Sequence, residues 1–536
     1  MKRSLRIALS ALGITTLLAM SATPALAATQ HSSSSNSIQP TSVPLPKPML
    51  NQDNPKKPGT WFLGATPPNV NNQPPIVFVQ GLHGEAQSYW WGDTTYYGHN
   101  EMYELAYQNG FRTAFVQLYD ANGEAQTPWE NGRLLAETLQ KIYAYFGQKV
   151  NIVGHSKGGV DTQAALVHYN AYPYVNKAIS LASPHHGSNL ADLAYSWYAG
   201  WLAELLGRKD KGTESLQTGN MKKFREQTDS HTHVNKNKYY TSAGTHWGPT
   251  FKALWFGGSY LSQYGPNDGM VNEWSTKLPY GNHMFTAKLD HDQMRKGSEV
   301  FPKIVSNLTA SSNLRVEAPK VSTPPQPMEE SVTGGPLKAN QSVEKYVSVD
   351  SSAKEAVFNL LTKYKNTKVT LISPSGKIYN NKSTVYHQNE DKEFFKGANQ
   401  QAFVIKQPEA GQWKVKINSK QKDAYLLTTY FNGADTVSVH VDQTVKANQN
   451  IPIQVQLNQP EKYDLSSLKV IMKTVSTDKK RTSQPEAKPN GKGKLIKELK
   501  ASAKSGTMNI TVEIKGKTKD GKPFERTEVV SIHVAN

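Results

Sequence analysis

The chain of 536 residues contains no cysteine. This absence excludes disulfide bonds, a thiol nucleophile and cysteine-ligated metals, so stability must come from apolar cores.

Long apolar segments are also scarce. The run from Ile7 to Met20 follows three basic residues and precedes the small residues Ala25-Leu26-Ala27. Because this run is too short to span a bilayer, residues 1–27 are predicted to be a secretory signal peptide. The mature protein is then extracellular, with no transmembrane segment.

Acidic residues are fewer than basic ones, and the formal net charge is +18. Residues 320–536 hold 34 lysines and arginines against 21 acidic residues, whereas residues 28–319 have a net charge of only +2. The positive field therefore belongs to the C-terminal part. It favours either an anionic partner, such as a cell-wall polymer, or simply a lysine-rich soluble face. Nucleic acid is not expected as a partner.

Strands alternate with helical patterns between residues 60 and 314. The preceding stretch, 28–59, is rich in Ser, Pro and Asn and is predicted to be a flexible leader. Thr127-Pro128 begins one helical pattern, with a capping residue followed by proline at the first helical position. The alternation predicts a mostly parallel sheet covered by helices, which is the α/β class. The predicted buried strands are 76–79, 113–118, 150–153, 175–181 and 238–243.

The texture of the sequence changes in its C-terminal part. A Pro- and Gly-rich stretch at 315–340 predicts a linker. Further on, Trp413, Val415 and Ile417 alternate with polar or basic residues, as strands with one buried face do. The length suits two antiparallel modules. They are predicted as a β-sandwich at 341–440 and a second, immunoglobulin-like sandwich at 441–536.

The pentapeptide Gly154-His155-Ser156-Lys157-Gly158 follows a β-branched run and opens an Ala-rich stretch. In this strand–turn–helix context, a G-x-S-x-G pattern forms a sharp turn that lifts the serine hydroxyl toward a substrate. Ser156 is therefore the predicted nucleophile. His155 is expected to pack away from the site, and the side chain of Lys157 is expected to pair with a carboxylate.

A serine hydroxyl needs a base to remove its proton and a third group to orient that base. In hydrolases with this elbow, the acid and then the histidine follow the serine along the chain. Asp268, in the turn at 267–271, is the predicted acid, and His291 is the predicted general base. A turn-capping role for the first and a surface position for the second are the alternatives. Asp290 and Asp292 are rival acids, but they lie too close in sequence to the histidine for good triad geometry.

A tetrahedral intermediate also needs N–H donors for its oxyanion. One is predicted at the backbone of Lys157, directly after the nucleophile. The other is expected in the loop after strand 76–79, which reads Gln80-Gly81-Leu82-His83-Gly84, with Leu82 as the donor. An ordinary glycine-rich turn is the alternative for this loop.

Together these motifs resemble the secreted bacterial true lipases of the α/β-hydrolase superfamily. The resemblance covers about residues 61–314, and His291 falls at the family's histidine position. It implies hydrolysis of carboxylic esters, with acylglycerols as the expected lipid substrates, through an acyl-enzyme on Ser156. No cofactor is expected to be required for this chemistry. The matching stretches are 80–84, 154–159, 182–188 and 267–271.

The sequence departs from the family pattern at two positions. The family usually opens its oxyanion motif with histidine, whereas this chain has Gln80, so the bonds that hold the loop must differ. Many relatives bind a structural calcium through a carboxylate two residues after the catalytic histidine. This chain has Gln293 there, and an amide is a weaker ligand for a hard cation. Asp290 and Asp292 remain weak calcium candidates.

The connection between 188 and 238 is longer than most connections between elements. It carries an apolar stripe that recurs every four residues and predicts one helix. That helix is either a mobile lid that turns its apolar side to a lipid surface or a permanently packed cap. The stripe consists of Leu193, Trp197, Trp201 and Leu205. The lid and substrate-binding candidates are Trp197, Tyr198, Trp201 and Leu202.

The sequence thus favours a secreted triacylglycerol lipase or esterase that uses a Ser-His-Asp triad. Two alternatives stay open. One is an extracellular polyester depolymerase of the polyhydroxyalkanoate type, whose β modules would hold the insoluble polymer. The other is a cell-surface binding protein with an incidental hydrolase domain.

Overall fold

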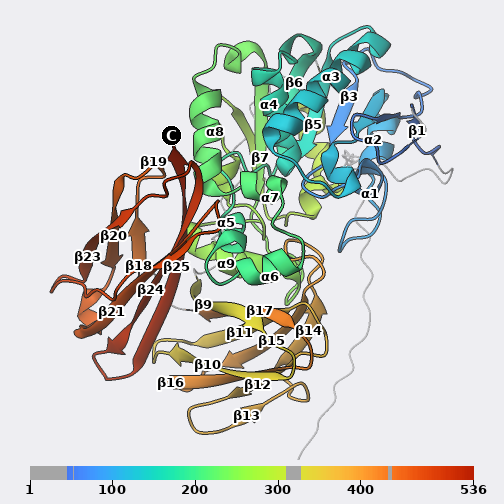
Figure 1. The fold of residues 1–536 in the computed structure, drawn as a ribbon. Coiled ribbons are helices and arrows are strands. Elements are labelled where there is room, and N and C mark those ends of the chain that lie inside the picture. The colour runs from blue at the N-terminus through green and yellow to red at the C-terminus, as the bar shows by residue number, and fades with distance from the viewer. Residues whose placement is uncertain (1–44, 52–53, 310–327, 433–436) are drawn as a thin grey trace, which may run out of the picture. The chain divides into compact units, whose positions relative to one another are not determined.

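A mostly parallel β-sheet organises the N-terminal half of the described chain (Figure 1). It contains β1 (Met49–Leu50), β2 (Trp61–Leu63), β3 (Ile76–Val79), β4 (Thr113–Val116), β5 (Val150–His155), β6 (Val175–Leu181), β7 (Lys238–Gly244) and β8 (Asn282–Ala287). The strand order is β1-β2-β4-β3-β5-β6-β7-β8. Neighbours from β4 to β8 pair in parallel, whereas β1 and β2 are antiparallel additions at one edge. The predicted α/β fold is confirmed, and β3 and β6 have the predicted bounds.

The structure, a computed structural model, describes residues 45–51, 54–309, 328–432 and 437–536. The predicted signal peptide, 1–27, lies outside the described residues. Residues 45–536 form one compact unit.

Helices pack on both faces of the sheet because successive residues of its strands point to opposite sides. In β3, Phe78 joins an apolar cluster with helices α2 and α10, whereas Val77 and Val79 join a second cluster with α3 and α4. The described helices are α1 (Ala86–Trp90), α2 (Met102–Gln108), α3 (Pro128–Phe146), α4 (Lys157–His168), α5 (Asn189–Tyr195), α6 (Gly200–Leu205), α7 (Lys211–Ser215), α8 (Thr218–Asp229), α9 (Ala253–Leu261) and α10 (Gly297–Leu308).

Helix α3 begins where its capping signals predict. The Thr127 side chain accepts a hydrogen bond from the backbone N–H of Glu130, and Pro128 occupies the first helical position. Its apolar face, which includes Leu135 and Leu139, is fully buried. The helix ends at Gly147, whose φ of 67° is the left-handed conformation that glycine adopts at low cost.

Two antiparallel β-sandwich modules follow, as predicted. The first pairs the sheet β10-β16-β12-β13 with the sheet β14-β15-β11-β17-β9 around a core that includes Trp413 and Phe358. Its strands are β9 (Met328–Leu337), β10 (Gln341–Val349), β11 (Glu355–Thr362), β12 (Lys368–Ile372), β13 (Ile378–Tyr379), β14 (Tyr386–Glu390), β15 (Asn399–Lys406), β16 (Gly411–Ser419) and β17 (Asp423–Asn432).

The second module packs the sheet β18-β20-β23 against β19-β25-β24-β21-β22, with Ile510 and Ile453 in its core. Its one parallel pair among the described strands is β19 with β25. The strands are β18 (Val437–His440), β19 (Thr444–Lys446), β20 (Asn450–Leu457), β21 (Tyr463–Ser476), β22 (Arg481–Ser483), β23 (Lys494–Lys500), β24 (Gly506–Thr518) and β25 (Pro523–Ala535).

Two segments predicted to lack regular structure contain strands. Within the predicted leader, 28–59, β1 pairs with β2, and within the predicted linker, 315–340, β9 pairs along β17. Each segment lies beside a sheet edge whose backbone groups need hydrogen-bond partners, and pairing satisfies both sides. Composition rich in Pro and Gly therefore did not prevent β9 from forming.

The predicted single lid helix is also different in the structure. It is interrupted, because Ser196 is extended with ψ 171° and separates α5 from α6. Both short helices and α9 contribute to an apolar cluster shared with strands β9, β11, β15 and β17 of the first sandwich. Among the described residues, no helix is long and apolar enough to cross a membrane.

Candidate active site

Ser156 lies in a strained turn between β5 and α4. Its φ of 54° and ψ of −133° are rare for a residue with a side chain. The backbone N–H of Ser156 donates to the carbonyl of Leu181 at 2.9 Å. At Gly158, a Cβ atom would lie 2.5 Å from the backbone oxygen of Gln80, so only glycine fits this close approach. The sharp turn expected from the sequence is present, with the strand before it and the helix after it.

Asp268 and His291 meet beside this turn, although 22 residues separate them in the chain. His291 Nδ1 lies 2.8 Å from Asp268 Oδ2, and the His291 backbone N–H donates to the Asp268 carbonyl at 2.9 Å. The other carboxylate oxygen accepts the backbone N–H groups of Met270 and Val271 at 3.0 and 2.8 Å. The carboxylate is buried and fully held by these donors, so it can orient the imidazole.

The Asp268 carboxylate favours the protonated form of the His291 imidazole. Burial of His291 acts to lower its pKa, but the adjacent Asp268 carboxylate and the hydrogen bond to it outweigh burial, and the pKa is raised above 6.5. A histidine in this state can take a proton from a neighbouring hydroxyl and hold the resulting cation against a carboxylate. The rivals Asp290 and Asp292 do not bond to the imidazole; among the described residues, Asp290 accepts from Tyr97 and Gln293, and Asp292 accepts from Tyr96 and Arg295.

Ser156 and His291 both line one cavity of about 130 Å³. Leu82, from the loop after β3, lines the same cavity. The three sequence motifs are thus brought together at the carboxyl ends of β3, β5 and β8, where open parallel sheets place their ligands. The other walls are formed by His83, Tyr89, Thr95, His155, Pro184, Ser188, Ala191, Leu216, Met270, Val271, Asp292, Arg295, Glu393 and Phe394.

His155 has a larger role than the packing expected from the sequence. It is one of the residues that line the cavity, and both of its ring nitrogens are bonded. Nδ1 lies 2.6 Å from the hydroxyl of Tyr89, and Nε2 lies 2.9 Å from the backbone carbonyl of His291. Burial lowers the pKa of His155 well below 6.5, so the neutral ring can accept from the phenol and donate to the carbonyl. It therefore ties the His291 loop to helix α1.

The loop expected to bind the oxyanion lies directly against the nucleophile. A Cβ atom on Gly81 would lie 2.8 Å from the Cβ of Ser156. The Gln80 amide, in the place of the family's histidine, bridges two backbone groups at the end of β4. Its nitrogen donates to the carbonyl of Val116 at 2.7 Å, and its oxygen accepts the N–H of Leu118 at 2.8 Å. A neutral side chain thus anchors this loop.

Asp290 and Asp292, the calcium candidates, are each bonded to protein donors. Asp290 accepts the hydroxyl of Tyr97 and the backbone N–H of Gln293, the latter at 2.8 Å. Asp292 pairs with Arg295 at 2.7 Å and accepts a backbone N–H at 2.8 Å. Both carboxylates are directed at protein donors, and the described residues contain no cluster of three His, Asp or Glu side chains suited to a metal.

The lid candidates lie against the C-terminal modules, not against the cavity. The Arg481 guanidinium stacks 4.5 Å from the ring centre of Trp197 and 4.7 Å from that of Trp201. The Tyr198 hydroxyl contacts Glu513, and Leu202 is buried in the shared apolar cluster. From the predicted insertion, the described residues that line the cavity are Ser188, Ala191 and Leu216.

Glu393 and Phe394 of the first sandwich close one side of the cavity. They belong to the connection between β14 and β15, and no motif in the sequence marked them. Burial raises the pKa of Glu393 to about 8, and the nearby carboxylates of Asp292 and Asp391 add to this effect. The C-terminal region therefore contributes a half-buried carboxyl group and an aromatic ring to the wall beside His291.

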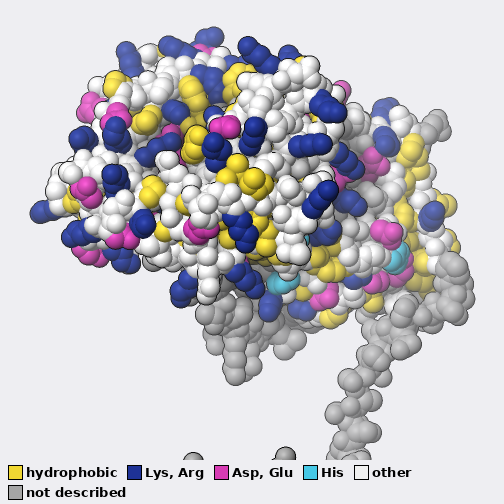
Figure 2. Space-filling view, turned by 90° about the horizontal axis from the view of Figure 1, so that it is seen from below, with side chains coloured by type: hydrophobic (Ala, Val, Ile, Leu, Met, Phe, Trp, Pro, Cys, Tyr) yellow, Lys and Arg dark blue, Asp and Glu magenta, His cyan; other side chains and the backbone are white. Residues whose placement is uncertain are grey.

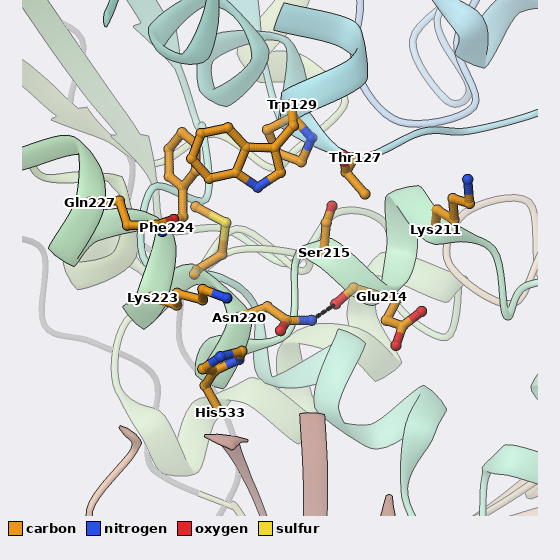
Figure 3. A pocket seen from close by; sticks show the side chains of 12 residues that line it. Thr127, Trp129, Lys211, Glu214, Ser215, Asn220, Lys223, Phe224, Gln227 and His533 are labelled. Carbon is orange, nitrogen blue, oxygen red and sulfur yellow. Dashed lines mark hydrogen bonds between the residues drawn. The ribbon is translucent and has the colours of Figure 1, made fainter. Parts of the chain in front are cut away.

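A second cavity of about 480 Å³ lies between α3, α7, α8 and the end of β25 (Figure 3). Trp129 and Phe224 form an aromatic part of its wall, and His533 enters from the second sandwich. The Asn220 side chain donates to the carbonyl of Glu214 at 2.8 Å across one side. None of the predicted site residues lines this cavity.

Comparison with known proteins agrees with the α/β-hydrolase fold. Residues 111–198 match a family described as an alpha/beta hydrolase of unknown function, DUF915. The crystal structure of Bacillus licheniformis lipase BlEst2 in its propeptide form is 33% identical over 90% of this chain and 98% of that chain, with a TM-score of 0.73. The chain belongs to this lipase family of α/β hydrolases.

Two further matches are shorter. A triacylglycerol lipase of Pseudarthrobacter phenanthrenivorans is 30% identical over 128 residues, and this alignment covers 22% of the present chain and 35% of that lipase. The mature form of the Bacillus licheniformis lipase is 46% identical over 47% of this chain and 99% of that chain, with a TM-score of 0.44. In this lipase-family chain, the elbow and the serine strand–helix unit fall within the matched family segment, 111–198.

Proposed function

We propose that this protein is a secreted carboxylic-ester hydrolase that acts on acylglycerols by a Ser156–His291–Asp268 triad. The observation that carries the proposal is the hydrogen bond between Asp268 and His291, which lines the same cavity as Ser156. Family membership supports the reaction class, and the similarity to a triacylglycerol lipase supports the substrate class. The predicted signal peptide supports secretion.

The proposed reaction has two acyl-transfer steps. Ser156 Oγ attacks the ester carbonyl carbon while His291 takes the hydroxyl proton, and the carbonyl oxygen becomes an oxyanion. Collapse of this intermediate breaks the bond to the alcohol, which leaves with the proton from His291. Water then attacks the acyl-enzyme, again with His291 as base, and the fatty acid is released. Asp268 holds the imidazole and stabilises its cation, and the N–H groups of Leu82 and Lys157 receive the oxyanion.

Replacement of Ser156 by Ala tests this function. We expect hydrolysis of p-nitrophenyl esters and tributyrin to fall to the level without enzyme, because no other hydroxyl is placed in the elbow. Ser259→Ala is the matched control, since this buried serine bonds a backbone carbonyl of α9, 2.9 Å away, and does not line the cavity. Turnover by Ser156→Ala equal to that of the wild type would exclude the triad.

We also propose that the C-terminal modules keep the hydrolase latent. The specific observation is that Glu393 and Phe394 occupy the cavity wall beside His291. The crystal structure that matches 90% of this chain is described as a propeptide form, which supports a similar role for the corresponding region here. A substrate with a long acyl chain would then require these residues to move.

The charge of residues 320–536 supports an anionic cell-wall polymer as a partner of the modules. On the face seen in Figure 2, Lys and Arg side chains are scattered among acidic ones and do not form a single block. Any such attraction is therefore diffuse and sensitive to salt. Binding of the full chain to cell walls that persists unchanged at high salt would contradict this proposal.

The polyester depolymerase alternative predicts clearing of polymer films that exceeds hydrolysis of lipid emulsions.

A further inference from the structure

A buried charge network lies beside the proposed nucleophile and is not used by the triad. Lys157, which follows Ser156, is fully buried and directs its ammonium at both oxygens of Asp161, each 2.9 Å away. The same ammonium lies 3.8 Å from Asp120 Oδ2. Burial acts to lower the pKa of Lys157, but Asp120 and Asp161 outweigh it and raise the pKa, so the group is a cation.

Asn131 joins the two carboxylates. Its side-chain nitrogen donates to Asp120 Oδ2 at 2.7 Å and to Asp161 Oδ2 at 2.9 Å. All four side chains are less than 4% exposed, so water cannot replace these bonds. The network connects the start of α4, the middle of that helix, α3 and the short 3₁₀ turn Tyr119–Asn122.

The remaining oxygen of Asp120 reaches the loop after β3. Asp120 Oδ1 accepts the backbone N–H of His83 at 3.1 Å. That N–H belongs to the peptide unit directly after Leu82, so the bond fixes the backbone on the C-terminal side of the proposed donor. His83 has a φ of 56°, a conformation that needs support in a residue with a side chain.

We infer that Asp120 is a positioning residue that, clamped by Lys157 and Asn131, sets the spacing between the two backbone N–H donors of the oxyanion site. One donor lies at Lys157, whose own side chain holds Asp120, and the other precedes the N–H that Asp120 holds. The inference rests on the proposed function, because it presumes that an oxyanion forms at Ser156. It gives the Lys157 side chain a role, which is to hold Asp120 in place.

The physical argument is that oxyanion donors act only within a narrow range of distance to the developing charge. Without Asp120, the His83 N–H loses its acceptor. The His83 ring keeps its contacts with Asp210 and Arg208, at 2.7 and 3.2 Å, but the peptide unit after Leu82 can tilt. Binding of the neutral substrate hardly depends on that tilt, whereas stabilisation of the charged intermediate depends on it strongly. Loss of Asp120 should therefore lower kcat and leave KM nearly unchanged.

Asp120→Ala in the full chain tests this inference with p-nitrophenyl acetate. We expect kcat to fall by about tenfold or more, with KM within a factor of two. Phenylboronic acid provides a second readout: its boron accepts Ser156 Oγ while the hydroxyl proton passes to His291. The resulting tetrahedral boronate anion places a boron-bound oxygen where the oxyanion forms. Its inhibition constant should rise by a factor similar to the loss in kcat. Asp120→Asn keeps an oxygen acceptor for His83 and should recover part of both losses.

Asp192→Ala is the matched control. Asp192 is equally buried and accepts two bonds from Thr218, at 2.9 and 2.8 Å, outside the cavity wall. It should lower the melting temperature without the joint change in kcat and boronate affinity. If folded Asp120→Ala retains wild-type kcat, or loses boronate affinity no more than Asp192→Ala does, the inference is wrong. If the wild type is no faster than Ser156→Ala, the proposed function itself is wrong.

Discussion

At the scale of single residues, the proton affinity of His291 decides when the proposed base is active. The imidazole must be neutral to accept the Ser156 proton, so kcat/KM should rise with pH through the raised pKa of His291. Asp268→Asn removes the carboxylate that raises this pKa. We expect the rising limb of the pH profile to move to lower pH, and kcat to fall by roughly 10⁴-fold because the imidazole loses its orientation. Initial rates with a soluble ester between pH 5 and 9 measure both effects.

The control for this prediction is Asp93→Asn, an exposed carboxylate outside the cavity wall. It should leave the position of the limb and the value of kcat unchanged. A limb that moves to higher pH in Asp268→Asn would show that Asp268 does not stabilise the imidazolium.

Sequence reasoning identified single residues where a motif and a chain order were available. Ser156, Asp268 and His291 follow from such signals; in the structure Ser156 and His291 line one cavity, and Asp268 bonds to His291 behind it. The role of His155 was missed because it depends on two partners, Tyr89 and the carbonyl of His291. These lie 66 and 136 residues away in the chain, and only the fold shows that they converge.

At the scale of helices and strands, the sequence predicted those elements whose ends are set by residues adjacent in the chain. Helix α3 follows from its cap and proline, and β3 and β6 follow from buried β-branched runs. Elements stabilised by distant partners were not predicted. The strand β9 forms along β17, which lies about ninety residues later, and the stripe that suggested one lid helix is divided into α5 and α6.

The connection between β14 and β15 is a short element whose titration should regulate access to the cavity. In the closed arrangement the pKa of Glu393 is about 8, against an ordinary value of 4.5. The closed state therefore holds an extra proton between these values. The stability of the closed state is complete below pH 4.5 and falls as pH rises from 4.5 to about 8. Within this window the equilibrium between the closed and open states shifts by up to about tenfold per pH unit, and above about 8 it changes no further.

Access can be separated from catalysis by two fluorophosphonates that label Ser156, one with a long chain and one with an ethyl group. We expect the ratio of long-chain to short-chain labelling to increase from pH 6 to pH 8, because titration of His291 affects both probes equally. Glu393→Gln should remove this increase, and Glu390→Gln, an exposed neighbour on β14, should retain it. A ratio that rises equally in the Glu393→Gln protein would exclude Glu393 as the titrating group.

At the scale of the whole molecule, an apolar cluster connects the hydrolase helices to the first sandwich. Leu193 of α5, Leu202 of α6 and Phe256 of α9 share it with Leu426 and Val332 of the sandwich. A cluster of this kind couples the stability of the two regions. Phe394, which lines the cavity, packs against it. In the proposed latent form, the strength of this cluster sets how readily the cavity opens.

Neighbouring residues of β17 allow this coupling to be tested, because they point to opposite faces of one sheet. Leu426 packs toward the hydrolase helices, whereas Leu427 packs inside the sandwich. Each leucine is 1% exposed, so replacement by Ala should destabilise the protein by a similar amount, roughly 2–5 kcal/mol. Leu426→Ala should in addition raise kcat/KM for long-chain p-nitrophenyl esters, because it weakens the contact that keeps the modules over the cavity.

Leu427→Ala serves as the control, since it weakens the interior of the sandwich and leaves the surface that meets α5, α6 and α9 in place. Thermal unfolding establishes that both variants lose similar stability, and the esters are then assayed at a temperature at which both remain folded. Activation by Leu426→Ala without activation by Leu427→Ala would locate latency at the contact between sandwich and helices. Equal activation of the two variants would instead assign latency to general loosening of the sandwich. If neither variant is activated, this apolar cluster does not control access to Ser156.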